Sequence, residues 1–392
     1  MALQPTAIGG FFYHPRLIAV VHLVSLGWIT GSILGSLYIV GPLALRMPLP
    51  AGSGDQAAFA SFAIGVLGMV SHFWIDRLAG MVWSGGLVTL AFAWVAARVL
   101  RGLPRAVVPR EVKLHVGLAL VNLLAVAALG LLLGINKLSP FLPFSQLSGV
   151  RAHAHLAVLG FALMMVMGAG YRLIPMVLPA AMPRGLWPWV TAVALQAGSL
   201  GLAVAMAVGQ GLAAAAAITL AALVAFLLRV VWMLRHRRPA PAEMRRPDWC
   251  VVHVMQSLAY LVLAAALGAF LAVAPASEHA LQATMAYGVF GLVGFLAQIV
   301  VGIEGRLLPL AAWLWGFSGG GFEASPPSLH RTPLRWLQAL VLLLWTLGVP
   351  ALAGGLYRGS DVVAASGAGL LCVATVANGA NLAVVLRRSK AR

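Results

Sequence analysis

The sequence is poor in charged residues. Aspartate, glutamate, lysine and arginine make up 9% of its 392 residues, whereas an average soluble domain contains about 25%. Hydrophobic residues account for 61% of the chain, which is more apolar surface than a soluble fold of this size hides from water. The composition therefore excludes a soluble enzyme, a disordered protein and a nucleic-acid-binding protein, and it indicates that lipid surrounds most of the chain.

Cysteine is scarce as well. The two cysteines, Cys250 and Cys372, lie far apart in apolar runs, and the sequence contains no CxxC or CxxCH motif. A disulfide framework and the covalent attachment of a c-type haem are therefore excluded.

Long hydrophobic segments dominate what is present. Each has about twenty residues, the length needed to cross a bilayer, and none shows the alternation of a barrel strand. The segments lie near 17–41, 57–75, 78–100, 114–135, 154–178, 187–208, 212–234, 250–273, 283–309, 336–356 and 362–386. They predict an all-α integral membrane protein with 11 or 12 transmembrane helices, in which residues 1–392 form a single membrane domain.

Basic residues give the chain a net charge of +17 and gather in 98–113, 229–246 and 387–392. These three clusters follow the third, seventh and eleventh segments, so all of them can face the same side of the membrane. The positive-inside rule then places the N-terminus outside and the C-terminus in the cytoplasm, as in a multi-pass protein of a bacterial inner membrane. Lipid is the expected partner, and the clusters do not indicate binding of nucleic acid.

The recurrence of basic clusters every four segments suggests an internal duplication. The segments that contain His22, His153 and Tyr287 align without gaps at offsets of 133 and 134 residues. The aligned positions share residue types: His22 with His155, Gly27 with Gly160 and Gly294, Gly35 with Gly168 and Gly302, Tyr38 with Tyr171, and Pro42 with Pro175 and Pro309. We expect three parallel four-helix-type repeats, 15–136, 150–275 and 280–388, in a pseudo-threefold arrangement whose third repeat lacks its fourth helix.

Four histidines fall near the predicted outer surface. His22, His153 and His155 lie near the starts of segments that run inward, and His72 ends a segment that runs outward. Ionisable groups inside a bilayer are costly and are usually functional. A matched pair such as His22 and His155, on neighbouring helices at one depth, suits bis-axial ligation of a haem iron, and His72 is a candidate ligand of copper or of a second haem.

Two arginines near the same layer, Arg77 and Arg151, are candidates to bind haem propionates, because guanidinium groups pair well with carboxylates. The alternatives without a metal are that His22 and His155 each donate a hydrogen bond to a carbonyl on a neighbouring helix, and that His72 belongs to an interfacial aromatic belt with Trp74.

Four further residues are secondary candidates. His115 aligns with His253 between the repeats, and both lie toward the cytoplasmic side, either at the interface or beside a quinone or a second haem. Tyr287 occupies the place of His153 in the third repeat and is either a hydrogen-bonded core residue or a redox and proton group. Glu304 is expected to form an ion pair with Arg306 or Arg172, or else to serve as the carboxylate through which protons enter.

The segment from Val150 to Pro175, VRAHAHLAVLGFALMMVMGAGYRLIP, resembles the haem-binding helix of subunit I of the haem–copper oxidases, especially the high-affinity cytochrome oxidases and the related nitric oxide reductases. The size, the helix number and the HxH start also resemble NnrS-type haem and copper membrane proteins. In the oxidases the two histidines of HxH hold two haems, and in this chain they correspond to His153 and His155. The motif falls in the third unit of the oxidases but in the second unit here.

Two assignments follow from this resemblance and both remain open. If the units are matched by ligand pattern, His153 holds the active-site haem, and His22 and His72 resemble copper ligands. If they are matched by symmetry, His22 and His155 hold one non-covalent b-type haem. The resemblance implies electron transfer, or binding and reduction of nitric oxide or oxygen, with cytochrome c or a quinol as electron donor and with copper as an optional second metal.

Whether the protein is an enzyme stays open at this point. The alternatives are a metal-free secondary transporter in which the histidines relay protons, and a structural subunit that anchors other membrane proteins.

Overall fold

The computed structural model describes residues 11–239, 246–317 and 333–390. Apart from one isolated β-bridge, between Ala180 and Arg237, the regular structure of these residues is helical. Within them, eleven helices are long and apolar enough to cross a membrane. The predicted class, an all-α multi-pass membrane protein, is therefore confirmed, and the observed spans coincide with the predicted segments along the chain.

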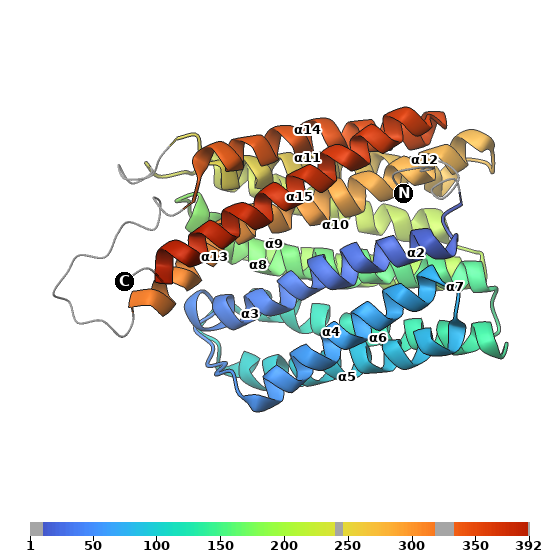
Figure 1. The fold of residues 1–392 in the computed structure, drawn as a ribbon, viewed down its shortest axis with the longest axis horizontal. Coiled ribbons are helices and arrows are strands. Elements are labelled where there is room, and N and C mark those ends of the chain that lie inside the picture. Colours follow the sequence, from blue (N-terminus) through green and yellow to red (C-terminus); the bar gives the residue numbers. More distant parts are fainter. Residues whose placement is uncertain (1–10, 240–245, 318–332, 391–392) are drawn as a thin grey trace. The chain divides into compact units, whose positions relative to one another are not determined.

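Eight of the eleven spans are continuous helices (Figure 1), one of them extended by the short 3-10 turn η2. They are α4 (Ser53–Trp74), α5 (Leu78–Gly102) with η2 (Leu103–Arg105), α6 (Arg110–Leu138), α9 (Trp187–Val208), α10 (Leu212–Arg235), α11 (Trp249–Val273), α14 (Arg335–Arg358) and α15 (Asp361–Lys390). Local chemistry sets many of their ends. The Asp248 side chain caps the first turn of α11, and α9 and α14 stop at Gly209 and Gly359, whose positive φ values suit glycine.

The other three spans are each interrupted by a π-helical segment. The first is α2 (Pro15–His22), η1 (Leu23–Thr30) and α3 (Gly31–Leu43); the second is α7 (Gln146–His155), η3 (Leu156–Leu163) and α8 (Met164–Val177); the third is α12 (Glu278–Gly288), η4 (Val289–Ala297) and α13 (Gln298–Phe317). The π segments begin at Leu23, Leu156 and Val289, so each starts 133 residues after the one before. A π segment of this length is rare and often marks a functional position.

The described helices group into two compact units, which we treat separately. The N-terminal unit contains α2 to α10, and the C-terminal unit contains α11 to α15. In the N-terminal unit, α6 runs along the whole broken helix α7, η3 and α8. In the C-terminal unit, α11 runs in the same way along α12, η4 and α13.

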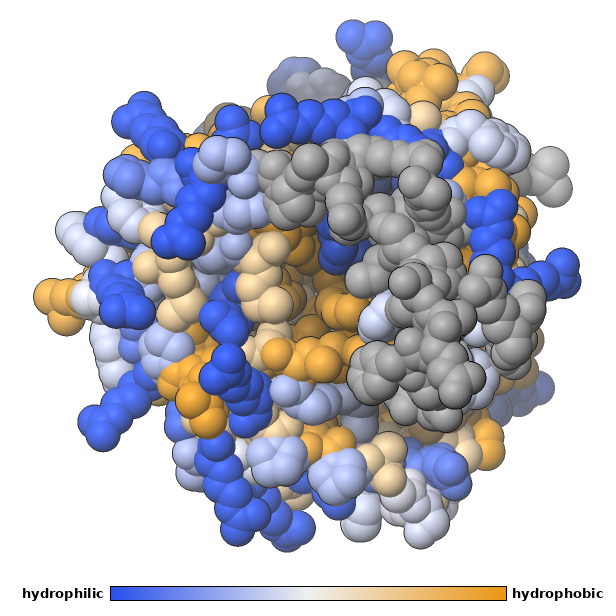
Figure 2. Space-filling model, turned by 90° about the vertical axis from the view of Figure 1, so that its left-hand side faces the viewer, coloured by the Kyte–Doolittle hydropathy of each residue, from blue (hydrophilic) through white to orange (hydrophobic). Residues whose placement is uncertain are grey.

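The basic loops of the N-terminal unit lie at one end of its helices. Three hydrogen bonds connect the end of α3, the loop after α5, the end of α8 and the end of α10: Val107 N donates to Leu45 O (3.0 Å), Arg172 Nε donates to Ala44 O (3.0 Å), and Arg238 N donates to Pro179 O (2.6 Å). Two basic clusters that are far apart in sequence, 98–113 and the described part of 229–246, are therefore on one side. Figure 2 shows that many hydrophilic residues lie around the outer part of the side that it presents.

The C-terminal unit has a similar basic end. Arg335 donates to the carbonyl of Pro247 (3.0 Å), and the Leu334 amide donates to the Asn381 side chain (2.8 Å). These contacts join the start of α11, the start of α14 and the last turns of α15, which lead into the basic tail. Arg245 and Arg392, members of the predicted clusters, lie outside the described residues.

Candidate functional site

The predicted outer histidines lie where two broken helices change from α to π geometry. His22 is the last residue of α2 and precedes η1, and His155 is the last residue of α7 and precedes η3. His153 lies two positions earlier on α7. Because two positions along an α-helix correspond to a rotation of about 200°, the side chains of His153 and His155 project from nearly opposite sides of α7.

Three of these rings are held in the same way by their own helices. Nδ1 lies 2.8 Å from Ile18 O in His22, 2.6 Å from Gly68 O in His72 and 2.9 Å from Arg151 O in His155. A carbonyl oxygen only accepts, so in each ring Nδ1 carries the proton and a neutral ring keeps its lone pair on Nε2. In metal-binding histidines, a hydrogen bond from the ring nitrogen that does not bind the metal commonly orients the ring.

His22 lies beside residues from two other helices. It lies close enough to His153 for charges on the two rings to repel each other, and the centroid of its ring is 4.9 Å from that of Phe73 on α4. His72 is the neighbour of Phe73 in the chain, so the end of α4 meets the end of α2. The structure therefore brings His22 together with His153 and places His72 at the same end of the N-terminal unit.

Glycines of neighbouring helices fix two of the rings. A Cβ atom at Gly130 of α6 would lie 2.8 Å from Cε1 of His153, and one at Gly80 of α5 would lie 2.1 Å from the ring of His72. No larger residue fits at either position without displacing an imidazole. The His153 ring makes a hydrogen bond to the Val126 backbone of α6, whereas its Nδ1 atom is buried and has no hydrogen-bond partner; a ligand or a water molecule could bind such an atom.

The donor types at this site fit a metal bound by imidazole, but the described residues contain no group of three or more His, Cys, Asp or Glu side chains placed to hold a metal ion. A haem iron needs only one or two protein ligands, so the paired histidines meet its demand, whereas a three-histidine copper site finds no matching cluster in this part of the chain.

The arginines expected at the site lie on its periphery. Arg77 precedes α5, is exposed, and donates its backbone amide to His72 O (2.8 Å). Arg151 lies on α7 and is exposed. Asp76 lies 3.9 Å from the Lys137 ammonium in an exposed ion pair, a pair that the sequence did not indicate.

His115 and His253 occupy matched places on α6 and α11, and both are buried, with 0% and 3% of their surface exposed. In His115 both nitrogens are engaged: Nδ1 with Glu111 O (2.8 Å) and Nε2 with the Thr191 hydroxyl (3.4 Å). That hydroxyl also bonds Tyr171. His115 is therefore a core residue held by the hydrogen bond from Nδ1, and its Nε2 faces a hydroxyl that donates its own proton to Pro188 O (2.9 Å).

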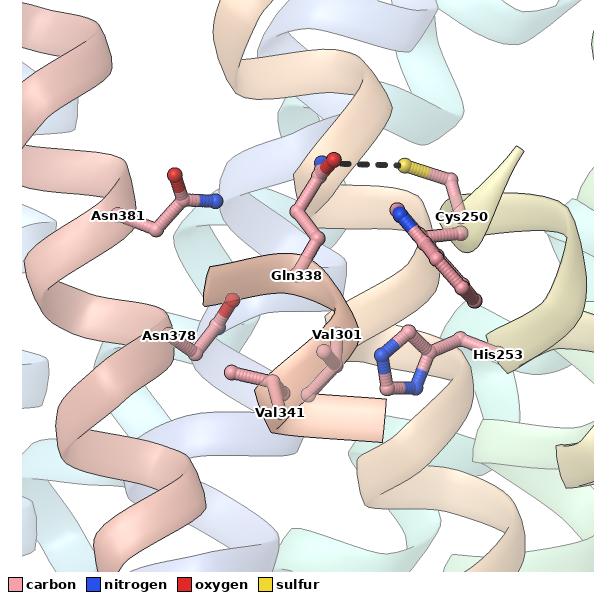
Figure 3. A pocket seen from close by; sticks show the side chains of 9 residues that line it. Cys250, His253, Val301, Gln338, Val341, Asn378 and Asn381 are labelled. Carbon is pink, nitrogen blue, oxygen red and sulfur yellow. Dashed lines mark hydrogen bonds between the residues drawn. The ribbon is translucent and has the colours of Figure 1, made fainter. Parts of the chain in front are cut away.

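His253 lines a small cavity of the C-terminal unit, seen in Figure 3. Cys250, Gln338, Asn378 and Asn381 converge on it from α11, α14 and α15. Its volume is about 10 Å³, the space of one water molecule. A quinone or a second haem beside His253 would need far more room than this cavity provides.

Tyr287 and Glu304, the remaining candidates, lie on α12 and α13. Tyr287 packs on Gly268 of α11, where a Cβ atom would be 3.2 Å from its ring, as His153 packs on Gly130. Glu304 is half-buried and has an interaction partner. Its predicted partners are engaged elsewhere as well, because Arg306 forms an ion pair with Asp248 and Arg172 bonds Ala44 O.

Sequence reasoning missed several buried amides. Asn122 on α6 donates to Gly160 O within η3 and to the Gln196 side chain, both at 2.7 Å. In the C-terminal unit, Gln298 donates to Gln256 Oε1 (3.0 Å) and lies 3.4 Å from Nδ1 of His253. The available signal was a single uncharged amide inside an otherwise apolar run, which is costly in a membrane unless it is paired.

Comparison with protein-family models found no matching family, and comparison with curated proteins found no significant match.

Proposed function

We propose that this chain is a haem-binding multi-pass membrane protein that transfers electrons or binds and reduces a small diatomic such as nitric oxide or oxygen. The observation that carries the proposal is the arrangement of His22 and His153. These imidazoles come from two separate broken helices and lie close enough for charges on the two rings to repel each other; one keeps its Nε2 lone pair and the other has a buried Nδ1 without a hydrogen-bond partner. Neutral imidazole nitrogens on rigid helices are the ligands that haem iron takes in such sites.

The chain's own residues would divide the work at such a site. His22, His153 and His155 are the axial ligand candidates, Arg77 and Arg151 would neutralise propionates, and His72 remains a candidate ligand of a second metal. The hydrogen bonds from Nδ1 to backbone carbonyls would hold the rings of His22 and His155 in one tautomer. A bound haem would supply the redox chemistry, with an external donor such as cytochrome c or a quinol.

The site belongs to a threefold internal repeat in our proposal, with units at 15–136, 150–275 and 280–388 and an arrangement like that of the haem–copper oxidase subunit I. Besides the equal spacing of the π segments, matched contacts support it. Three pairs between a helix and the next broken helix recur at equivalent positions: His115 with Gly168 and His253 with Gly302; Asn122 with Gly160 and Tyr260 with Gly294; Gly130 with His153 and Gly268 with Tyr287.

We place the basic helix ends in the cytoplasm of a bacterial cell, in accordance with the positive-inside rule. The N-terminus is then outside, and His22, His72 and His153 lie near the outer surface of the inner membrane. Within each unit the basic segments share one end, which supports this orientation.

One observation favours the alternative, a metal-free secondary transporter with a histidine proton relay. A polar chain runs from the buried His253 and Gln298 through the half-buried Gln256 to the exposed Thr346 hydroxyl in the C-terminal unit. Histidines that belong to polar chains inside a membrane often take part in proton relays. The same spectrum that tests the first proposal separates the two.

The test is an optical spectrum of the protein purified from haem-replete cells. We expect a Soret band and a reduced-minus-oxidised alpha band, and we expect His153→Ala, His22→Ala and His155→Ala each to weaken or abolish the pigment while circular dichroism stays unchanged. His236→Ala is the matched control, because His236 has the same hydrogen bond from Nδ1 to the carbonyl four residues earlier (Trp232, 2.9 Å) but is exposed at the other end of the unit. A colourless wild-type protein would refute the proposal.

A further inference from the structure

A thiol and an imidazole share the small cavity near the start of α11. Cys250 and His253 both line it, and they are 8% and 3% exposed. Because they lie three positions apart on one helix, their side chains share a face, with Cβ atoms about 5–6 Å apart. Every residue that lines the cavity belongs to α11, α13, α14 or α15, so the C-terminal unit forms this space by itself.

Comparison with the N-terminal unit shows why space is left here. At the equivalent place, His115 meets the ring of Tyr171 edge-on, with the two ring centroids 5.4 Å apart. The matched contacts of the two units place Gly305 at the position of Tyr171, and Cys250 at the position of the buried Val112. The C-terminal unit therefore has a cavity and a sulfur atom where the N-terminal unit has a tyrosine ring and a valine.

Two ligand atoms face this space without a close partner. Among the described residues, the hydrogen bonds of His253 involve its Nδ1, which lies 3.4 Å from Nε2 of Gln298, and none reaches its Nε2. The Cys250 sulfur has a long contact with the Gln338 amide, at 4.0 Å. The three side chains are turned toward the same space (Figure 3). Buried polar atoms normally have a partner, so these atoms indicate a ligand in the cavity.

We propose that Cys250 and His253 bind a single soft metal ion, Cu(I), through the thiolate sulfur and Nε2. Thiolate ligands favour Cu(I), and this ion accepts two donors, whereas a structural Zn²⁺ takes four. The described residues contain no group of three or more His, Cys, Asp or Glu side chains that could hold a metal. The cavity, about 10 Å³, has room for one ion. The site goes beyond the proposed haem site and does not depend on it.

The charges in this region also suit a monovalent ion. On binding, the Cys250 thiol releases its proton to solvent, and the thiolate and Cu(I) together carry no net charge. Asp248 and Arg306 lie close enough to act on the charge of Cys250, but they form an ion pair with each other. A divalent ion on the same two ligands would leave a buried net charge, which is costly.

Gln298 acts as a positioning residue that sets the tautomer of His253. Its Nε2 donates to Nδ1 of His253 (3.4 Å) and to Gln256 Oε1 (3.0 Å), whereas its Oε1 is buried without a partner. A metal on Nε2 of His253 requires the ring proton to move to Nδ1. A half-turn of the Gln298 amide then offers Oε1 to that proton and to the Gln256 amide, which can turn as well because both of its ends bond the Thr346 hydroxyl. The number of hydrogen bonds is unchanged.

The direct test is a Cu(I) competition with the full-length protein, purified from haem-replete cells and kept free of oxygen. Cu(I) is supplied as its coloured bicinchoninate complex. We expect the wild type to take up one Cu(I) per chain more than Cys250→Ser, and X-ray absorption to show a sulfur neighbour of copper that Cys250→Ser lacks. His253→Gln should weaken binding at this site by about tenfold or more. Cys372→Ser is the matched control, because Cys372 is the exposed cysteine of the same unit. Circular dichroism should be unchanged in every variant.

Two results would overturn the proposal. Equal uptake by the wild type and Cys250→Ser, with no sulfur next to copper, would show that the cavity holds only water. An equal loss in Cys372→Ser would assign the uptake to non-specific capture by thiols. A colourless protein that still binds Cu(I) through Cys250 would refute the haem proposal and leave this one intact.

A second test addresses His253 as a ligand through its neighbour. We expect Gln298→Leu to weaken Cu(I) binding by about 10–100-fold, because the group that orients the ring is lost. Gln298→Glu should retain the affinity, since a carboxylate accepts the proton on Nδ1. Equal affinities of Gln298→Leu and the wild type would refute the role of His253 as the second ligand.

Discussion

The substitution Gly168→Ala tests how tightly α6 packs against the second broken helix. The new methyl group would lie 2.5 Å from Cβ of His115 and 3.5 Å from the backbone nitrogen of Val116. Neither atom is the flexible end of a side chain, so α6 or α8 must move. Forcing one extra methyl group into a well-packed core costs about 1–3 kcal/mol, and we expect a loss of that size in the free energy of unfolding.

Gly35→Ala at the aligned position of the first broken helix is the control. The added methyl group has open space there, and alanine is favoured over glycine in a helix interior by about 0.5–1 kcal/mol. The two substitutions are chemically identical and should therefore change stability in opposite directions. The assay is reversible unfolding in mixed detergent micelles followed by tryptophan fluorescence. Equal effects of the two substitutions would show that α6 does not approach α8 as described.

Two further predictions concern buried polar groups. Asn122→Ala removes the donor to Gly160 O and leaves the Gln196 amide without its partner, so we expect the free energy of unfolding to fall by about 1–2 kcal/mol. Gln196→Ala should cost less in the Asn122→Ala background than in the wild type. Additive losses in this double-mutant cycle would contradict the pairing. Asp55→Ala removes the acceptor of the Tyr38 hydroxyl (2.7 Å) and the Trp94 indole (3.0 Å) and the counter-ion of Arg98 (3.3 Å). We expect the free energy of unfolding to fall by about 2 kcal/mol, and by less in Asp55→Asn. A stability of Asp55→Ala equal to that of the wild type would contradict this.

Much of the fold follows from hydrophobic run length alone. Each predicted segment corresponds to an observed span because about twenty apolar residues in lipid have one way to satisfy their backbone, which is to form a helix. The weakest predictions were at the ends. The span predicted at 154–178 begins at Gln146, since the Ser145 side chain caps a polar first turn that carries no hydropathy signal.

The candidate site could be predicted in part. The HxH motif and the aligned His22 pointed to the ends of α2 and α7 and predicted His22 and His155 as the matched pair, whereas the histidine that the structure places near His22 is His153. Hydropathy says nothing, however, about which of two histidines on one helix turns toward a neighbour. The ion pair between Asp248 and Arg306 was missed for a similar reason, because it joins residues 58 positions apart through helix packing.

The π segments could not be foreseen from composition, because their residues are as apolar as those around them. Their backbone bonds reach five residues back, as from Gly31 N to Leu26 O and from Met164 N to Leu159 O. Polar side chains take up carbonyls within two of these segments: Asn122 bonds Gly160 O, and the Trp345 indole bonds Val293 O (3.3 Å).

These wide turns set the phase between the two halves of each broken helix. Because a π turn holds about one residue more than an α turn, rewinding η3 as an ordinary α-helix with all its residues kept would rotate everything beyond it by about 100° for each extra residue. The outer half would still present His153 to His22, while the inner half would swing Gly168 off the surface of α6 and carry Arg172 away from Ala44. The wide turns therefore absorb one residue of the chain and keep the two layers of the bundle aligned, and a change that tightened them without removing that residue would misalign both layers.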